Sequence, residues 1–381
     1  MTTHSFRRQQ INLANWRLQP YSQWTFQNAG EIVPSATIAS RRKPETTLRA
    51  LGGLASLPVD DLSGATSLEQ FLARHSTDAF VVMRGGEFAA EWYSPHCDPS
   101  RPHLIFSITK SMTGLLAAAL VERGMVAYET RTDEVLPEMR GSAFADATLR
   151  HLLDMQVSVD FVDDYLDTQG AFDRYRRAML WNPEKGGADA PPLRGFLASL
   201  SKASHPHGTQ HAYHSINTDM AGLFLEAATG RRFADLMSEL VWKPLGAHSD
   251  AFITVDREGA SRAAGGMSTT ARDLARVGEM IRLRGAGIIA QAQMADIWSG
   301  GNSTIWAAGD QAWLFDGGSY RSCFYHDGRG CLAGIGIHGQ WLWIDPSTET
   351  VIVRLSCEPV PVNEKLDHAV IAMLRAVAIA S

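Results

Sequence analysis

The sequence predicts an α+β fold, in which an antiparallel β-sheet flanked by helices carries an inserted, mostly α-helical domain. Three observations support this prediction: a hairpin signal at residues 81–93, helical patterns across residues 125–245, and alternating strand patterns at residues 333–355. Strands at both ends of a helical stretch favour one sheet that the C-terminal third of the chain completes. With 381 residues, 45% of them hydrophobic, the chain can bury a large core and fold into two subdomains.

The order of these elements gives the expected domain boundaries. Residues 1–60, rich in Pro, Gln and Arg, predict an irregular N-terminal arm packed on the body of the protein. Residues 61–124 and 246–381 are expected to form the sheet domain, and residues 125–245 the helical domain. Because ligand sites often lie between two such parts, we expect the active site in the cleft between them.

Turn and capping residues mark the individual elements. Gly85 and Gly86 separate the two short strands of the first hairpin, and Pro346 lies in the turn between two later strands. An apolar, alanine-rich run that ends at Gly124 predicts a buried helix. Thr270 precedes a further helix with favourable capping chemistry, and a closing helix is expected near residues 364–380.

The composition excludes several classes of function. A formal net charge of −6 offers no basic surface for nucleic acid or for an anionic membrane. No stretch approaches the roughly 18 uninterrupted apolar residues of a membrane span, and residues 1–16 lack the features of a secretory signal. The cysteines lack metal or redox spacing, which predicts free thiols in a cytoplasmic protein; they are Cys97, Cys323, Cys331 and Cys357. No motif indicates the oligomeric state, and a homodimer is kept as an alternative to a monomer.

The strongest chemical signal is the pair Ser107 and Lys110, set directly before the alanine-rich helix. Residues three apart on a helix share a face, so the lysine amine can lie beside the serine hydroxyl. An adjacent amine can help to deprotonate that hydroxyl, as an activated serine nucleophile requires. A position in the first helical turn adds free backbone N–H groups and the helix dipole, which favour a developing negative charge.

Two later motifs can complete such a site. Tyr213 precedes an apolar helix, where a nearby cationic lysine would stabilise its phenolate for proton transfer; a tyrosine simply packed at a helix start is the alternative. Gly334, Gly336 and Gly339 match Gly-x-Gly-x-x-Gly, but a strand follows where a dinucleotide site needs a helix. Glycines in a strand instead permit the close approach of a ligand, whose carbonyl could accept a backbone N–H there.

A cluster of histidines raises the alternative of a metal site. These residues lie in a loop with Pro206 and Gly208 and lack the helical i, i+4 pattern typical of zinc ligands. We therefore expect no metal and no other cofactor. The histidines are His205, His207, His211 and His214.

In their order along the chain, Ser107-x-x-Lys110, Tyr213-x-Ser215 and the glycine strand resemble the serine β-lactamase and penicillin-binding-protein superfamily. Within it, the chain resembles the 6-aminohexanoate-dimer hydrolases, the nylon-oligomer-degrading branch related to carboxylesterases. Seven ordered phrases support this resemblance: 107–111 (SITKS), 154–158 (DMQVS), 164–167 (DYLD), 217–219 (NTD), 253–256 (ITVD), 270–278 (TARDLARVG) and 334–340 (GIGIHGQ).

The resemblance implies a β-lactamase-like fold and a catalytic role for four residues. Ser107 would be the nucleophile, Lys110 its proton-sharing partner, and Tyr213 the general base and acid. The backbone N–H groups of Ser107 and Ile337 would form the oxyanion hole.

The resemblance also implies substrate contacts. Tyr165 would close over the substrate and hydrogen-bond its amide nitrogen, and Asp173 would favour the amino end of a nylon dimer. Further contacts are expected from Ser215, Gly336 and His338.

The chain departs at several positions from the proteins that it resembles. The segment between Tyr165 and Asp173 is shorter than in the nylon-dimer hydrolases, and Ala264 stands where the best amide hydrolases carry a polar residue. No lysine occurs between Lys243 and Lys365, so the C-terminal strand lacks the Lys-Thr-Gly that would hold the carboxylate of a β-lactam.

We therefore expect a cytoplasmic serine hydrolase that forms an acyl-enzyme with small esters or with linear amides such as 6-aminohexanoate oligomers. Two alternatives stay open: a β-lactamase or D,D-peptidase-like activity, and a non-catalytic member that uses the cleft to bind a ligand. Because esters need no help with protonation of the leaving group, esterase activity is the safer expectation.

Overall fold

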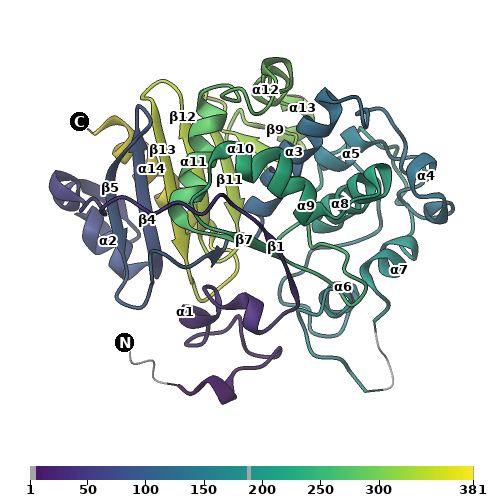
Figure 1. Ribbon diagram of the computed structural model, residues 1–381, viewed down its shortest axis with the longest axis horizontal. Helices are drawn as coiled ribbons and strands as arrows, with labels where there is room; N and C mark the ends of the chain where they lie inside the picture. Colours follow the sequence, from purple (N-terminus) through teal and green to yellow (C-terminus); the bar gives the residue numbers. More distant parts are fainter. Residues whose placement is uncertain (1–5, 187–189, 381) are drawn as a thin grey trace.

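A seven-stranded antiparallel sheet forms the centre of the protein, in a computed structural model that describes residues 6–186 and 190–380 (Figure 1). The strand order is β5-β4-β13-β12-β11-β10-β9, so the first hairpin pairs with the C-terminal strands as the sequence predicts. The strands are β4 (Thr77–Arg84), β5 (Glu87–Tyr93), β9 (Ser319–Arg321), β10 (Phe324–His326), β11 (Leu332–Gly336), β12 (Gln340–Asp345) and β13 (Thr350–Ser356).

Helices cover both faces of this sheet. Helix α11 (Ala271–Arg282) packs on β4, β12 and β13, while α14 (Glu364–Ile379) and α2 (Leu68–Arg74) pack on the opposite face. Successive side chains of a strand point to opposite faces, so Val81 joins the core on the α11 side and Val82 the core on the α14 side. The expected capping at Thr270 is present, since its side chain accepts a hydrogen bond from the Asp273 N–H.

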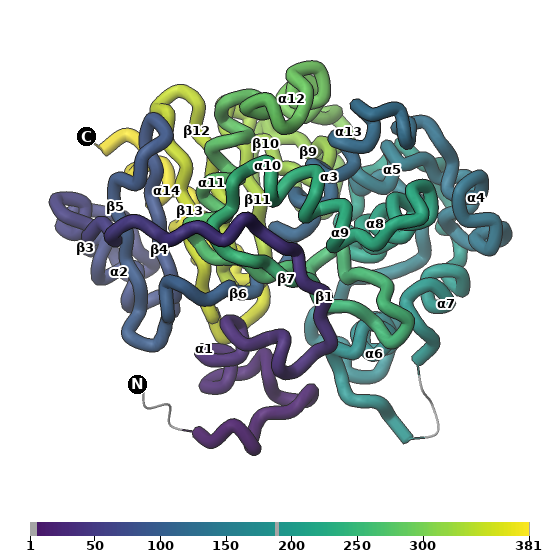
Figure 2. The backbone as a smooth tube through the Cα atoms, in the orientation of Figure 1, coloured from purple at the N-terminus to yellow at the C-terminus, as the bar shows by residue number. Residues whose placement is uncertain are grey.

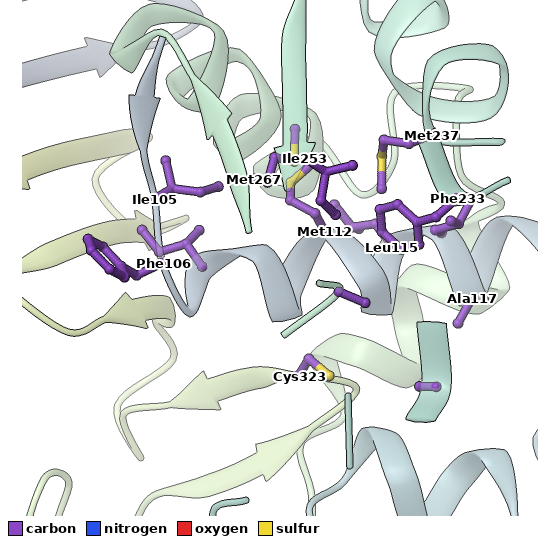
Figure 3. Packing of buried hydrophobic residues seen from close by; sticks show 14 of the residues in the cluster. Ile105, Phe106, Met112, Leu115, Ala117, Phe233, Met237, Ile253, Met267 and Cys323 are labelled. Atoms are coloured by element: carbon purple, nitrogen blue, oxygen red, sulfur yellow. The ribbon is translucent and has the colours of Figure 1, made fainter. Parts of the chain in front are cut away.

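A helical layer lies beside the sheet, built around α3 (Ile108–Glu122) and α8 (Ser215–Thr229). Every residue of α3 from Ile108 to Leu120 is buried, and Figure 3 shows Met112 and Leu115 packed among side chains from several segments. The other helices of this part are α4 (Thr132–Val135), η4 (Pro137–Met139), α5 (Leu149–Leu153), α6 (Ala171–Ala178), α7 (Leu193–Ala198), α9 (Phe233–Met237), η5 (Ser238–Trp242) and α10 (Lys243–Leu245).

The N-terminal arm is more regular than its composition predicts. Its strand β1 (Ser35–Ile38) pairs antiparallel with β7 (Ala251–Thr254) and becomes the edge of a four-stranded sheet of order β1-β7-β8-β6. In Figure 2 the purple arm runs from β1 across the molecule towards β3. The remaining elements are η1 (Arg8–Gln10), α1 (Ser22–Thr25), η2 (Ala29–Glu31), η3 (Gly52–Ser56), β2 (Pro58–Asp61), β3 (Gly64–Ser67), β6 (His103–Leu104), β8 (Met267–Thr269), α12 (Gln291–Trp298) and α13 (Ser303–Ala307).

The arm is fixed to the helical part by Trp16. Its side chain is fully buried, and the indole Nε1 donates a hydrogen bond to the Trp181 carbonyl at 3.1 Å. The two indole rings pack edge to face with their centroids 5.2 Å apart. Burial of a large aromatic surface together with a satisfied indole N–H makes this contact a strong local anchor.

The fold tests two of the expectations about function. Among the described residues, no helix combines the length and the apolar character that a bilayer crossing needs. The glycines of residues 334–339 lie in β11 and in the turn to β12, not before a helix. A dinucleotide-binding site needs a helix N-terminus at this point, so the fold excludes such a site here.

The buried anchor gives a testable expectation for stability. Trp16→Ala should lower the free energy of unfolding by about 3–5 kcal/mol, because a buried indole is lost and a cavity remains. Urea unfolding followed by circular dichroism measures this change. Leu18→Ala is the control, since Leu18 is 56% exposed and its change should stay within about 0.5 kcal/mol. Equal effects of the two substitutions would contradict the assignment.

Candidate active site

Ser107 lies at the N-terminal end of α3, where the chain turns sharply out of β6. Phe106, the residue before it, has φ of +44°, a left-handed conformation that is uncommon for a residue with a side chain. Such conformations persist where the surroundings fix them, and they often lie at functional sites. The Phe106 ring is held against Phe26 and His338, with ring centroids 4.9 and 5.3 Å away.

Lys110 contacts three oxygen atoms from three parts of the chain. Its Nζ lies 2.9 Å from Ser107 Oγ, 3.3 Å from Ser215 Oγ and 2.7 Å from the Ala264 carbonyl. Burial lowers the pKa of Lys110 to about 8, although the nearby carboxylates of Asp163 and Asp219 oppose this shift. Burial therefore makes this amine easier to deprotonate near physiological pH than the amine of an exposed lysine.

Tyr213 completes the predicted set. Its ring lies beside the lysine, with Lys110 Nζ 5.0 Å from the ring centre, and both Tyr213 and Ser107 line the same cavity. Burial raises the pKa of Tyr213 above its ordinary value, although the hydrogen bonds to Ser107 and Tyr325 oppose this. The Asp310 carboxylate accepts a hydrogen bond from the Tyr213 N–H at 3.0 Å and so fixes the backbone at this point.

These groups meet at a cavity of about 300 Å³. Its walls come from distant segments, since Ser107 lies at the start of α3, Tyr165 and Tyr213 come from residues 125–245, and Ile337 follows β11. Its lining residues are Ser107, Tyr165, Tyr213, Asp310, Gln311, Trp313, Leu314, Tyr325, Ile335, Gly336, Ile337, Gly339, Pro361, Val362, Glu364 and Asp367.

The strand β11 passes very close to the start of α3. A Cβ atom on Gly336 would lie 2.7 Å from the Ile105 carbonyl and 3.0 Å from the Ser107 nitrogen. Among the described residues, neither the Ser107 N–H nor the Ile337 N–H donates a hydrogen bond to the backbone. Both residues line the cavity, where an N–H group without a backbone acceptor is a candidate donor to the carbonyl of a ligand.

The other predicted substrate residues have different positions. Tyr165 lines the cavity, and its ring packs edge to face on Phe172 at 5.3 Å. Gly336 lines it as well, whereas Ser215 lies behind it and contacts Lys110.

Asp173 and His338 do not line the cavity, so the structure does not bring them together with the other predicted substrate residues. The Asp173 carboxylate is occupied by Arg177, Lys185 and Asn182, at 3.2, 2.8 and 2.8 Å. His338 has φ of +62°, and its Nδ1 lies 2.7 Å from the Glu358 carbonyl, so its ring points into the core. Burial lowers the pKa of His338 to about 4, and the ring is neutral.

The histidine loop shows no metal site within the described residues. His207 contacts Asp146 at 3.0 Å, while His211 and His214 lie 3.4 and 3.6 Å from aspartates of their own. Within the described parts of the chain, one group of side chains brings potential metal-ligand atoms close together. It consists of Asp78, His96 and Cys357. The four cysteines are free thiols, as expected.

Several residues of the site were not apparent from the sequence. The Ala264 carbonyl and the φ of Phe106 act through the backbone, which side-chain motifs do not reveal. Asp310 and Tyr325 lie in irregular or short segments without a distinctive pattern. The stretch 361–367 could have been noticed only as the segment that leads into the closing helix.

Comparison with known proteins identifies the family of the chain. Residues 65–375 match the family model described as Beta-lactamase. The chain belongs to the beta-lactamase family. It is 36% identical to the 6-aminohexanoate-dimer hydrolase of Paenarthrobacter ureafaciens over 356 residues, which cover 92% of this chain and 88% of that protein.

Solved structures of beta-lactamase-like proteins share the fold. A Bacillus anthracis protein provisionally named 6-aminohexanoate-dimer hydrolase superposes with a TM-score of 0.88 at 26% identity and covers 98% of both chains. EstCE1, described as a hydrolase with promiscuous acyltransferase activity, gives a TM-score of 0.59 at 19% identity over 81% of this chain and 96% of that one. The predicted family, the β-lactamase-like α+β fold and the hydrolase class are thus confirmed.

The close approach of β11 to α3 predicts the effect of one methyl group. Gly336→Ala should slow the labelling of Ser107 by a fluorophosphonate about 10²-fold, because the clash displaces an oxyanion donor. Gly53→Ala is the control, since a Cβ on Gly53 meets no atom within 4 Å. A folded Gly336→Ala protein that is labelled at the wild-type rate would contradict the proposed donor geometry.

Proposed function

We propose that the protein is a serine hydrolase that acts through an acyl-enzyme on carboxylic esters and on linear amides such as 6-aminohexanoate oligomers. The observation that supports this most is the contact of Ser107 Oγ with Lys110 Nζ at 2.9 Å, beside the Tyr213 phenol and open to a cavity. A nucleophile, a base within hydrogen-bond reach and a third orienting group are the parts that nucleophilic catalysis requires.

The path of the proton is inferred from the shifted pKa values of Tyr213 and Lys110. Tyr213 is a neutral phenol at rest because burial raises its pKa, whereas the lowered pKa of Lys110 makes its neutral amine accessible at physiological pH. Lys110 therefore accepts the Ser107 proton as the hydroxyl attacks the carbonyl carbon. Tyr213 donates its proton to the leaving alcohol or amine, and Lys110 restores it. Tyr213 thus keeps the acid role of the sequence interpretation, and Lys110 takes the role of the base.

The oxyanion of the tetrahedral intermediate is stabilised by the N–H groups of Ser107 and Ile337. Neither N–H group donates a hydrogen bond to a backbone carbonyl of the described residues. Fixed donors in a buried site stabilise the charge that develops in the transition state more than they stabilise the substrate. Water then attacks the acyl-enzyme and returns a proton to Ser107 through the same groups.

A β-lactamase or D,D-peptidase activity is less well supported. Strand β11, which would face the carboxylate of a β-lactam, has the sequence Leu-Ala-Gly-Ile-Gly and carries no cationic residue. A non-catalytic role is disfavoured by the retention of the complete set of reacting groups. For the cellular location we propose the cytoplasm, because four unpaired thiols suit a reducing compartment.

The roles of Ser107 and Tyr213 can be tested with p-nitrophenyl butyrate. Ser107→Ala should reduce kcat by more than about 10³-fold, because the nucleophile is lost. Tyr213→Phe should reduce turnover by about 10²–10⁴-fold, because proton transfer to the leaving group is lost. Ser63→Ala, at an exposed position, is the control. Undiminished turnover by Ser107→Ala, or failure of a fluorophosphonate to label Ser107, would refute the proposal.

The pKa of Lys110 predicts a pH profile. If the neutral amine is the base, kcat/KM should rise about tenfold per pH unit well below pH 8 and level off above it, since kcat/KM reports the free enzyme. Burial also raises the pKa of Asp367, in the cavity wall, to about 7. Asp367→Asn is therefore the control. In this variant kcat/KM should still rise with pH and level off near pH 8. A profile that falls with rising pH would show that protonated Lys110 is required.

A further inference from the structure

Asp78 is the centre of a buried group of side chains outside the catalytic cavity. Its Oδ1 atom lies 2.6 Å from His96 Nε2 and 3.2 Å from Cys357 Sγ. One potential ligand atom of each of these three residues lies within 4.8 Å of the other two. Carboxylate oxygen, imidazole nitrogen and thiol sulfur are the kinds of atom that bind metal ions in proteins. We call Asp78, His96 and Cys357 the Asp78 cluster.

The fold brings the members of this cluster together. Strands β4 and β13 pair antiparallel with Ser356 opposite Thr77, so Cys357 comes to lie beside Asp78 (Figure 1). His96 reaches them from the loop between β5 and β6. Spacing along the sequence could not reveal the cluster, because its members lie in three separate segments.

The Asp78 carboxylate is shielded from water and lacks a strong permanent cation. Asp78 is 2% exposed, and its ion-pair partners are the histidines His96 and His103. Within residues 6–186 and 190–380, no lysine or arginine forms an ion pair with it. A buried carboxylate is costly unless a cation or hydrogen bonds compensate it. The side chain of His96 is 21% exposed, so the cluster can be reached from solvent at this edge.

His103 holds the carboxylate from the other side. Its Nε2 lies 2.9 Å from Asp78 Oδ2, and its Nδ1 lies 2.9 Å from the Leu104 carbonyl. Both partners are acceptors, so we assign a proton to each ring nitrogen. The charge-assisted hydrogen bond to Oδ2 leaves Oδ1 directed at His96 and Cys357. Ligating carboxylates of metal sites are held by outer hydrogen bonds in the same way.

The donor set of the Asp78 cluster suits zinc. Zn²⁺ accepts oxygen, nitrogen and sulfur ligands, whereas Mg²⁺ and Ca²⁺ prefer oxygen ligands alone. Zinc bonds of about 2.0–2.3 Å place tetrahedral ligand atoms about 3.3–3.8 Å apart. Each of the two contacts of Asp78 Oδ1 reaches such a separation by opening less than about 1 Å. One carboxylate and one thiolate also neutralise the two charges of the ion in a buried site.

We propose that the Asp78 cluster binds one zinc ion through Asp78 Oδ1, His96 Nε2 and Cys357 Sγ, with water as the fourth ligand at the exposed edge. The Cys357 thiol gives its proton to solvent as the Zn–S bond forms, and His96 carries its ring proton on Nδ1, which frees the Nε2 lone pair. Burial and the Asp78 carboxylate raise the pKa of Cys357, so the thiol keeps its proton until a cation reaches it. A bound metal ion reverses this balance and deprotonates a coordinating thiol.

The role of this ion is structural. His103, which orients Asp78, lies in β6, four residues before Ser107. The Phe26 ring packs 5.9 Å from the His103 ring and 4.9 Å from the Phe106 ring, so the surroundings of the cluster continue to the segment that carries the nucleophile. None of the three ligands lines the catalytic cavity. The inference therefore goes beyond the proposed hydrolase function and does not depend on it.

Cobalt and zinc titrations test the proposal. The full chain, without a histidine tag and stripped with EDTA before dialysis, is titrated with Co²⁺. One equivalent should produce a thiolate-to-cobalt charge-transfer band and the visible bands of tetrahedral cobalt, and one equivalent of Zn²⁺ should remove both. Mg²⁺ should leave the spectrum unchanged, because it prefers oxygen ligands. Protein that shows no cobalt spectrum, or a cobalt spectrum without the charge-transfer band, overturns the proposal.

Two variants assign the metal to the Asp78 cluster. Cys357→Ser should remove the charge-transfer band, and His96→Ala should weaken zinc binding at least tenfold in calorimetry. Because the His96 side chain is partly exposed, its removal costs little packing. Cys331→Ser, at another buried free thiol, and His207→Ala, in the histidine loop, are the controls and should keep the spectrum. A band that persists in Cys357→Ser or disappears in Cys331→Ser overturns the assignment.

Thermal unfolding gives an independent measurement. Zinc bound by the folded cluster should raise the Tm of the wild type by about 3–6 °C at saturation. In His96→Ala the shift should fall to less than half. Equal shifts in the two proteins, or no shift in the wild type, would overturn the proposal. None of these measurements uses ester hydrolysis, so their failure leaves the hydrolase proposal standing, and absence of fluorophosphonate labelling leaves the zinc proposal standing.

Discussion

The site depends on one buried amine. Lys110 Nζ joins Ser107 on α3, Ser215 at the start of α8 and the Ala264 carbonyl before β8, so three segments that are far apart in the sequence share one point of contact. Burial of that amine is what lowers its pKa to about 8, so the contact that organises the site also prepares its chemistry. The Gly336 strand closes the arrangement from the other side, because only a residue without a side chain fits against the Ser107 nitrogen.

Much of this could be predicted from the sequence because the relevant signals are local. Ser107 and Lys110 share a helical face, Tyr213 precedes a helix, and the alternation of apolar residues in residues 77–93 and 332–356 defines the two faces of the sheet. These patterns follow from the fixed periods of the helix and the strand, which tertiary contacts seldom change. The family resemblance rests on the same positions, and the comparisons confirm it.

The parts that could not be predicted depend on tertiary contacts. Asp173 was assigned to substrate by its place in a motif, but its carboxylate is occupied by ion pairs formed with residues that follow it. His338 sits in a left-handed turn that directs its ring into the core. The arm was expected to be irregular because of its composition, yet β1 finds an unpaired edge on β7, a partner more than 200 residues away in the sequence.

The anchor of the arm at Trp16 has a consequence for the helical part. The next residue, Arg17, is held against the Trp181 carbonyl by the same segment that the indole fixes. A chain region outside the catalytic phrases thus holds the segment around Trp181 in place. The local order of the helical part therefore depends on residues that lie more than 160 positions away along the chain.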